Sequence, residues 1–139
     1  MKNLSWMCLV LWLMILSTIL IPSFAEESAP TITPYYTHTN TLVVSLNIKN
    51  GQAKAAGQIV PYSNQRTSIT VKLQKKGNGN VWSTISIWSG SNTKGASEAG
   101  GYKTIDKGCQ YRVYVIGKVY GSTGDVVETV SKYSTVKSS

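Results

Sequence analysis

The chain has 139 residues, of which fourteen are basic and six acidic, so its formal net charge at pH 7 is +8. One histidine and two cysteines are too few for a zinc site, and the acidic residues are too sparse to suggest the paired carboxylates of a glycosidase. The basic residues are scattered along the chain, which argues against a dedicated nucleic-acid site and favours a solvated basic surface.

The N-terminal segment has the order of a secretory signal peptide. A lysine near the start precedes an apolar, helix-forming run at residues 4–21, and small residues follow at Ser23 and Ala25. We expect cleavage after Ala25, which removes residues 1–25 and leaves a secreted, extracellular chain with a net charge of +7. The alternative is an uncleaved membrane anchor, because the apolar run is about long enough to begin spanning a bilayer.

Residues 26–40 are rich in threonine and proline, and we expect them to form a tether. Pro30 and Pro34 disfavour regular structure there. The only histidine, His38, lies in this tether, and nothing in the neighbouring sequence suggests that it is held near Cys109. A Cys–His catalytic dyad is therefore not expected, and the folded domain is predicted over residues 41–139.

The rest of the chain alternates apolar and polar residues with a period of two, in short runs separated by turn residues. We expect about seven strands, at residues 42–48, 53–61, 68–74, 81–88, a weak one ending near 105, 111–120 and 126–133. Asn50-Gly51 predicts a hairpin between the first two strands, and the Gly- and Ser-rich residues 89–101 predict a flexible loop. The pattern predicts an all-β, antiparallel β-sandwich.

Small side chains and a lone cysteine give two further expectations about packing. Ala53, Ala55 and Gly57 share one face of the second strand, which implies a close approach by the opposing sheet. Cys109 is the only cysteine after residue 25, so it forms no internal disulfide. Either it is buried as a small apolar residue, or it pairs with another molecule.

Four passages resemble small, mostly uncharacterised secreted proteins of Gram-positive, clostridial type. They are TVKLQKK (residues 70–76), WSTI (82–85), GCQYRVYVIGKVY (108–120) and GDVVETVSKYS (124–134). The resemblance covers roughly residues 35–134, implies an immunoglobulin-like sandwich and carries no catalytic residues. Asp106-Lys107-Gly108 followed by Tyr111 is also similar to the approach to the sixth strand of immunoglobulin domains, where a tyrosine anchors the corner. No cysteine stands opposite Cys109, so the disulfide of antibody domains is absent.

Aromatic and basic residues on two strands give the candidate binding surface. If Ile85 and Ile87 face the core, strict alternation places Trp82 and Trp88 together on the outer face of their strand. The candidate binding residues are Trp82, Trp88, Tyr114, Tyr120, Arg112 and Lys118. The rings offer broad apolar contact and arginine pairs with phosphate. The alternative is structural, because a bulge between Trp82 and Ile85 would turn Trp82 inward.

These features favour a secreted, non-enzymatic module with no cofactor and no metal. We expect it to bind an anionic cell-wall polymer, other extracellular material or an extracellular protein through its surface, and not nucleic acid. It would meet a membrane only through an uncleaved signal segment. The alternative function is a secreted cationic antimicrobial or competition protein, which the size, the export signal and the positive charge also fit.

Overall fold

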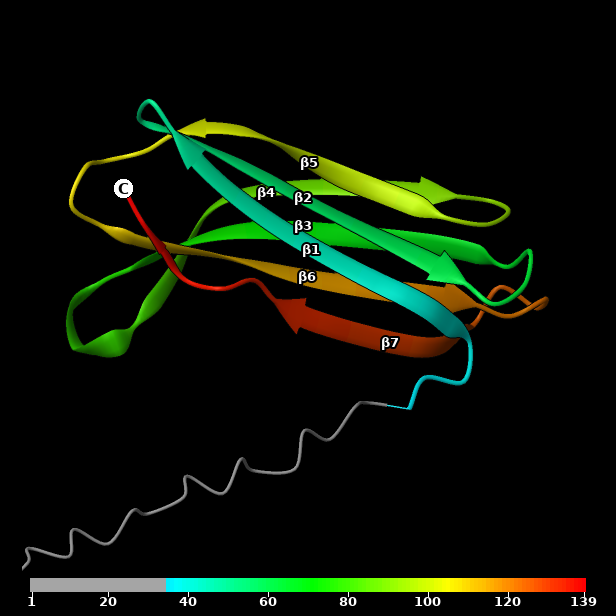
Figure 1. Cartoon of the computed structure of the whole chain (residues 1–139). Helices are drawn as coiled ribbons and strands as arrows, with labels where there is room; N and C mark the ends of the chain where they lie inside the picture. Colours follow the sequence, from blue (N-terminus) through cyan, green and yellow to red (C-terminus); the bar gives the residue numbers. More distant parts are fainter. Residues whose placement is uncertain (1–34) are drawn as a thin grey trace, which may run out of the picture. The chain divides into compact units, whose positions relative to one another are not determined.

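The computed structural model describes residues 35–139, which form an all-β domain (Figure 1). Its strands are β1 (Thr39–Lys49), β2 (Gln52–Pro61), β3 (Arg66–Lys76), β4 (Trp82–Asn92), β5 (Ser97–Thr104), β6 (Gln110–Tyr120), β7 (Val126–Tyr133) and β8 (Lys137–Ser138), with one 3₁₀ turn at Asn78–Asn80. The predicted signal peptide and the predicted tether up to residue 34 lie outside the described residues. Within residues 35–139, no helix is long and apolar enough to cross a membrane.

Two antiparallel sheets make up the domain. The smaller sheet has the strand order β1-β2-β5, and the larger has the order β4-β3-β6-β7, with the short β8 pairing with β6. The smaller sheet lies across one face of the larger, so that the domain is a β-sandwich (Figure 1). The hairpin between β1 and β2 turns at Asn50 and Gly51, both with positive φ, as the sequence predicts.

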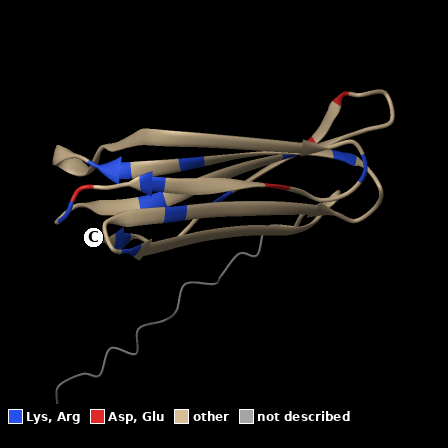
Figure 2. Cartoon of the chain, turned by 90° about the horizontal axis from the view of Figure 1, so that it is seen from above, with Lys and Arg blue, Asp and Glu red and all other residues tan. Residues whose placement is uncertain are grey.

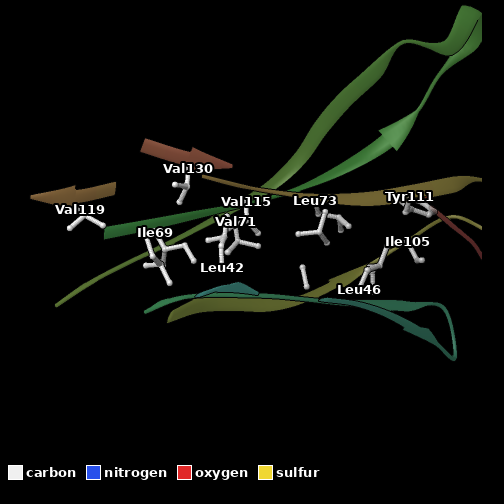
Figure 3. Packing of buried hydrophobic residues seen from close by; sticks show 14 residues of the cluster. Leu42, Leu46, Ile69, Val71, Leu73, Ile105, Tyr111, Val115, Val119 and Val130 are labelled. Carbon is white, nitrogen blue, oxygen red and sulfur yellow. The ribbon is translucent and has the colours of Figure 1, made fainter. Parts of the chain in front are cut away.

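The core fills the space between the two sheets (Figure 3). Alternation is regular from Thr67 to Leu73 in β3 and from Tyr111 to Val119 in β6, where every second side chain is buried. The buried apolar residues are Leu42, Leu46, Ala53, Ala55, Ile59, Ile69, Val71, Leu73, Ile105, Tyr111, Val113, Val115, Val119 and Val130. The predicted inward sets of β3 and β6 are therefore confirmed, and the residues that alternate with them lie on the outer face of the larger sheet.

The sheets approach each other closely at β2, as its small residues predict. A Cβ atom placed on Gly57 would lie 2.9 Å from a methyl group of Val115 and 3.0 Å from one of Val71. Both valines come from the larger sheet, so a side chain at this position would push the sheets apart.

A β-bulge in β4 reverses the expected alternation. Ile85 has no partner in β3, because the register between the two strands shifts there. Beyond the bulge, Ile87 is 59% exposed, whereas Trp88 packs against the core. The prediction that Trp82 and Trp88 share the outer face is wrong, because the extra residue shifts the period by one. Trp82 remains on the outer face and Trp88 turns inward.

The Gly- and Ser-rich residues 89–101 form the end of β4 and the start of β5, which lie in different sheets, where the sequence predicts a flexible loop. β4 continues to Asn92, and β5 begins at Ser97. A Cβ atom on Gly101 would collide with the indole of Trp88. Glycine in this strand therefore serves packing, which composition alone does not distinguish from a loop.

The last residues of the predicted tether are bound to β7. The backbone N–H of Thr37 donates to a carboxylate oxygen of Glu128 at 2.7 Å, and the hydroxyl of Thr39 donates to the other at 2.6 Å. The backbone N–H of His38 also donates to Glu128, and its carbonyl accepts a hydrogen bond from the N–H of Tyr62 at 2.9 Å. The backbone of His38 is thus held in place, which the sequence does not predict.

Candidate functional site

The outer face of the larger sheet brings together three of the residues that the sequence marks as candidates. Pairing of β3 with β6 places Gln74 opposite Arg112. Pairing of β6 with β7 places Tyr133 opposite Tyr114. Trp82, before the bulge in β4, lies on the same face as these side chains.

Four side chains on this face form a row in which each contacts the next: Trp82, Arg112, Tyr133 and Tyr114. We call them the arginine stack. The guanidinium carbon of Arg112 lies 4.3 Å from the ring centroid of Trp82 and 4.2 Å from that of Tyr133. The rings of Tyr133 and Tyr114 are stacked, with centroids 4.4 Å apart and planes inclined by 19°. Cation–π attraction and ring stacking therefore fix the position of the guanidinium.

Among residues 35–139, the guanidinium of Arg112 makes one side-chain hydrogen bond and keeps its remaining N–H donors. Its Nε donates to Oε1 of Gln74 at 2.8 Å, which orients the planar group. Among residues 35–139 the one ion pair joins Lys75 and Asp106, so no carboxylate of these residues balances the charge of Arg112. A guanidinium in this state can form a bidentate pair with a phosphate or carboxylate group.

A second cation–aromatic pair lies at the other end of the same face. The guanidinium carbon of Arg66 is 4.7 Å from the ring centroid of Tyr120, and the Tyr120 hydroxyl is 3.0 Å from that of Ser68. We call Arg66 and Tyr120 the distal pair. Lys118 is exposed and lies opposite Ser68. Tyr120 lies eight positions after Arg112 in β6, or about 26 Å along the strand.

The structure thus divides the six candidate residues into three groups. Trp82, Arg112 and Tyr114 belong to the arginine stack, while Tyr120 and Lys118 lie at the distal end of the same face. Trp88 is packed against the core and does not belong to this surface.

Sequence reasoning missed three residues of this surface: Tyr133, Gln74 and Arg66. Tyr133 and Gln74 lie in predicted strands and Arg66 lies two residues before one, and each is aromatic or polar. Their partners depend on the pairing register of β3, β6 and β7. Residue types alone do not give that register, because many registers bury the same apolar set.

Glu128 and Cys109 lie outside this surface, and each has hydrogen-bond partners of its own. Burial would raise the pKa of Glu128, but hydrogen bonds from Thr39, Thr37 and His38 outweigh it and hold the pKa at about 2. Cys109 is half-buried, and its thiol lies 3.7 Å from a backbone carbonyl oxygen. Within residues 35–139, no group of three or more His, Cys, Asp or Glu side chains gathers to hold a metal ion.

The outer face of the smaller sheet carries a shallow groove of about 570 Å³. Ala56 and Gly100 form part of its floor, and Tyr102 and Lys54 lie at one end, with the ammonium 5.5 Å from the ring centroid. Glu98 also lines the groove. This face therefore offers a cation–aromatic pair similar to the distal pair, with a carboxylate four residues along β5 from Tyr102.

Comparison with known proteins identifies no family for this chain. No protein-family model matches the chain, and no curated protein matches it at a significant level.

Proposed function

We propose that this chain is a secreted, non-enzymatic binding module that recognises an anionic polymer of the cell envelope through the outer face of its larger sheet. The observation that carries the proposal is the state of Arg112. Its guanidinium is held between two rings and oriented by Gln74, yet no carboxylate of residues 35–139 pairs with it. A fixed, uncompensated guanidinium suits recognition of a phosphate or carboxylate on a ligand.

The charge of the domain supports an anionic ligand. Residues 35–139 hold thirteen lysines and arginines against four acidic residues, and the sequences of β3, β4 and β6 contain no aspartate or glutamate. Basic residues recur along the strands, whereas acidic residues occupy only a few positions (Figure 2). Such a field attracts polyanions and raises their association rate. Export to the cell envelope is the reading that the N-terminal sequence favours.

The scaffold of the proposed module is an immunoglobulin-like sandwich. Two observations support this type. The first is the strand order, with β1-β2-β5 in one sheet and β4-β3-β6-β7 in the other. The second is the hydroxyl of Tyr111, which accepts a hydrogen bond from the backbone N–H of Asp106 at 3.0 Å and donates to its carbonyl at 3.2 Å. A tyrosine in this role at the start of the sixth strand is a hallmark of immunoglobulin-like domains.

Sedimentation of the purified protein with Gram-positive cell wall, at low and at high salt, tests the proposed function. Trp82→Ala and Arg112→Gln should each reduce the bound fraction. Tyr102→Ala and Lys54→Gln are the matched controls, because they remove an aromatic ring and a cation from the opposite face and should bind normally. Equal loss in all four variants, or binding that high salt abolishes in every protein, would reduce the interaction to non-specific charge attraction.

A further inference from the structure

The cations on the outer face of β3 and β6 form a line. In the antiparallel pairing of β3 with β6, Lys72 lies opposite Tyr114, which is two positions from Arg112 along β6. Arg66 lies opposite Tyr120, which is eight positions from Arg112. With about 3.3 Å per residue, the cations after Arg112 lie roughly 7 Å (Lys72), 20 Å (Lys118) and 26 Å (Arg66) along the strands. From Arg112 to Arg66 the line is thus about 26 Å long, and Lys76 on the same face of β3 extends it by about 7 Å beyond Arg112.

The line is narrow and of a single sign. β3 and β6 are neighbouring strands, so the backbones that carry these outward side chains are about 4.8 Å apart. Neither strand contains an acidic residue. The single carboxylate of β7, Glu128, receives hydrogen bonds from Thr37, His38 and Thr39. A single extended chain matches this width better than a double helix or a branched polymer.

Two arginines of the line are held against rings. Arg112 contacts Trp82 and Tyr133, and Arg66 contacts Tyr120. Arginine held in this way keeps its in-plane donors available while losing little further freedom on binding. The same contacts occupy ring faces, since Tyr133 already stacks on Tyr114 and on Arg112. Each of these contacts covers one ring face that a nucleic-acid base would otherwise need for stacking.

We infer that this face binds one unbranched polyanion with phosphate groups along its backbone and no bases. The polymer lies extended along β3 and β6, so that Arg112 and Arg66 hold two anionic groups of the same chain about 26 Å apart. This inference rests on the proposed function and adds the distal pair to it as a second anchor. Two anchors on one chain raise affinity through effective concentration, but only for a chain long enough to reach both.

Inorganic polyphosphate of graded length is the probe, and its affinity for the purified protein is measured by titration calorimetry. Chains longer than the line should bind roughly tenfold or more tightly, per chain, than chains that reach only one anchor. Arg66→Gln should remove this gain and leave the affinity for short chains unchanged. Arg112→Gln should weaken binding at every length, and Lys54→Gln on the opposite face should change neither quantity.

The outcomes separate the inference from the proposed function. If Arg112→Gln weakens binding but the gain with length survives Arg66→Gln, the two-anchor inference is overturned and the proposed function stands. If Lys54→Gln acts as strongly as Arg112→Gln, both are overturned. A single-stranded oligonucleotide of equal length and charge should bind more weakly than polyphosphate, and equal or tighter binding would overturn the assignment of a ligand without bases.

Discussion

The carboxylate of Glu128 accepts a hydrogen bond of 2.6 Å from the hydroxyl of Thr39, a side chain with no exposed surface. Glu128 lies in β7 of the larger sheet, and Thr39 begins β1 of the smaller one. Three further donors from Thr37 and His38 complete the shell of the carboxylate. One acidic side chain therefore joins the edges of both sheets where the first strand begins.

This contact predicts a loss of stability in acid. Hydrogen bonds to the ionised form overcome the opposing effect of burial and hold the pKa of Glu128 at about 2, below its ordinary value of 4.5. The stabilisation is therefore complete above pH 4.5 and is lost as the pH falls towards 2. We expect a loss of about 2 kcal/mol, below the full linkage value because solvent screens the partly exposed carboxylate.

Urea unfolding between pH 2 and 7, compared for the wild type and Glu128→Gln, measures this contribution. The variant should be less stable at neutral pH and should approach the wild type near pH 2. The comparison also removes the effect of Asp106, whose pKa is lowered by its hydrogen bond and ion pair with Lys75 in both proteins. Parallel stability curves across the whole range would contradict the prediction.

Tyr111→Phe tests the corner at the start of β6. The substitution keeps the buried ring but removes the hydroxyl that bonds to the N–H and carbonyl of Asp106. We expect a loss of about 1–2 kcal/mol in the free energy of unfolding, because two backbone groups lose their partner. Tyr102→Phe removes a hydroxyl from an exposed ring of the smaller sheet and should leave stability unchanged. Equal midpoints for the two variants in urea would contradict the role of Tyr111.

Most of the fold could be predicted from the sequence because, in the regular strands, the alternation of residue types indicates which face is buried. In β3 and β6 the apolar residues alternate without interruption, and both inward sets are as expected. The faces predicted for β4 are wrong beyond Ile85, because the bulge there adds one residue and no residue type marks such an insertion. The sequence predicts only a weak strand at β5, because its glycines are typical of a loop. Their role in packing depends on Trp88, which occupies the space above Gly101.

The candidate site was predictable only within single strands. Arg112 and Tyr114 follow from alternation along β6, and they lie where the sequence places them. The contact of Arg112 with Trp82 and Tyr133 joins three strands, and it depends on pairing registers and on the position of the bulge. These are tertiary quantities, so a single sequence does not determine which aromatic residues surround the arginine.

The two tryptophans of β4 should respond differently to substitution. Trp88→Ala removes a ring that packs against the core and against Gly101 of β5. We expect it to lower the free energy of unfolding by about 3 kcal/mol. Trp82→Ala removes an outer ring and its contact with Arg112, and we expect a loss of about 1 kcal/mol. Equilibrium unfolding in urea measures both. Equal losses would mean that the two rings share one environment, as strict alternation without the bulge would require.

Arg112→Lys distinguishes a built anion site from a merely positive surface. Lysine keeps the charge, but it lacks the planar group that lies against Trp82 and Tyr133 and the fork of donors that can hold a phosphate bidentately. We expect affinity for long polyphosphate to fall about tenfold, close to the effect of Arg112→Gln, while the slope of affinity against salt stays near that of the wild type. The measurement is a salt series by calorimetry for the three proteins. If the lysine variant binds as tightly as the wild type, the arginine stack contributes charge alone, and its rings serve only to stabilise the sheet.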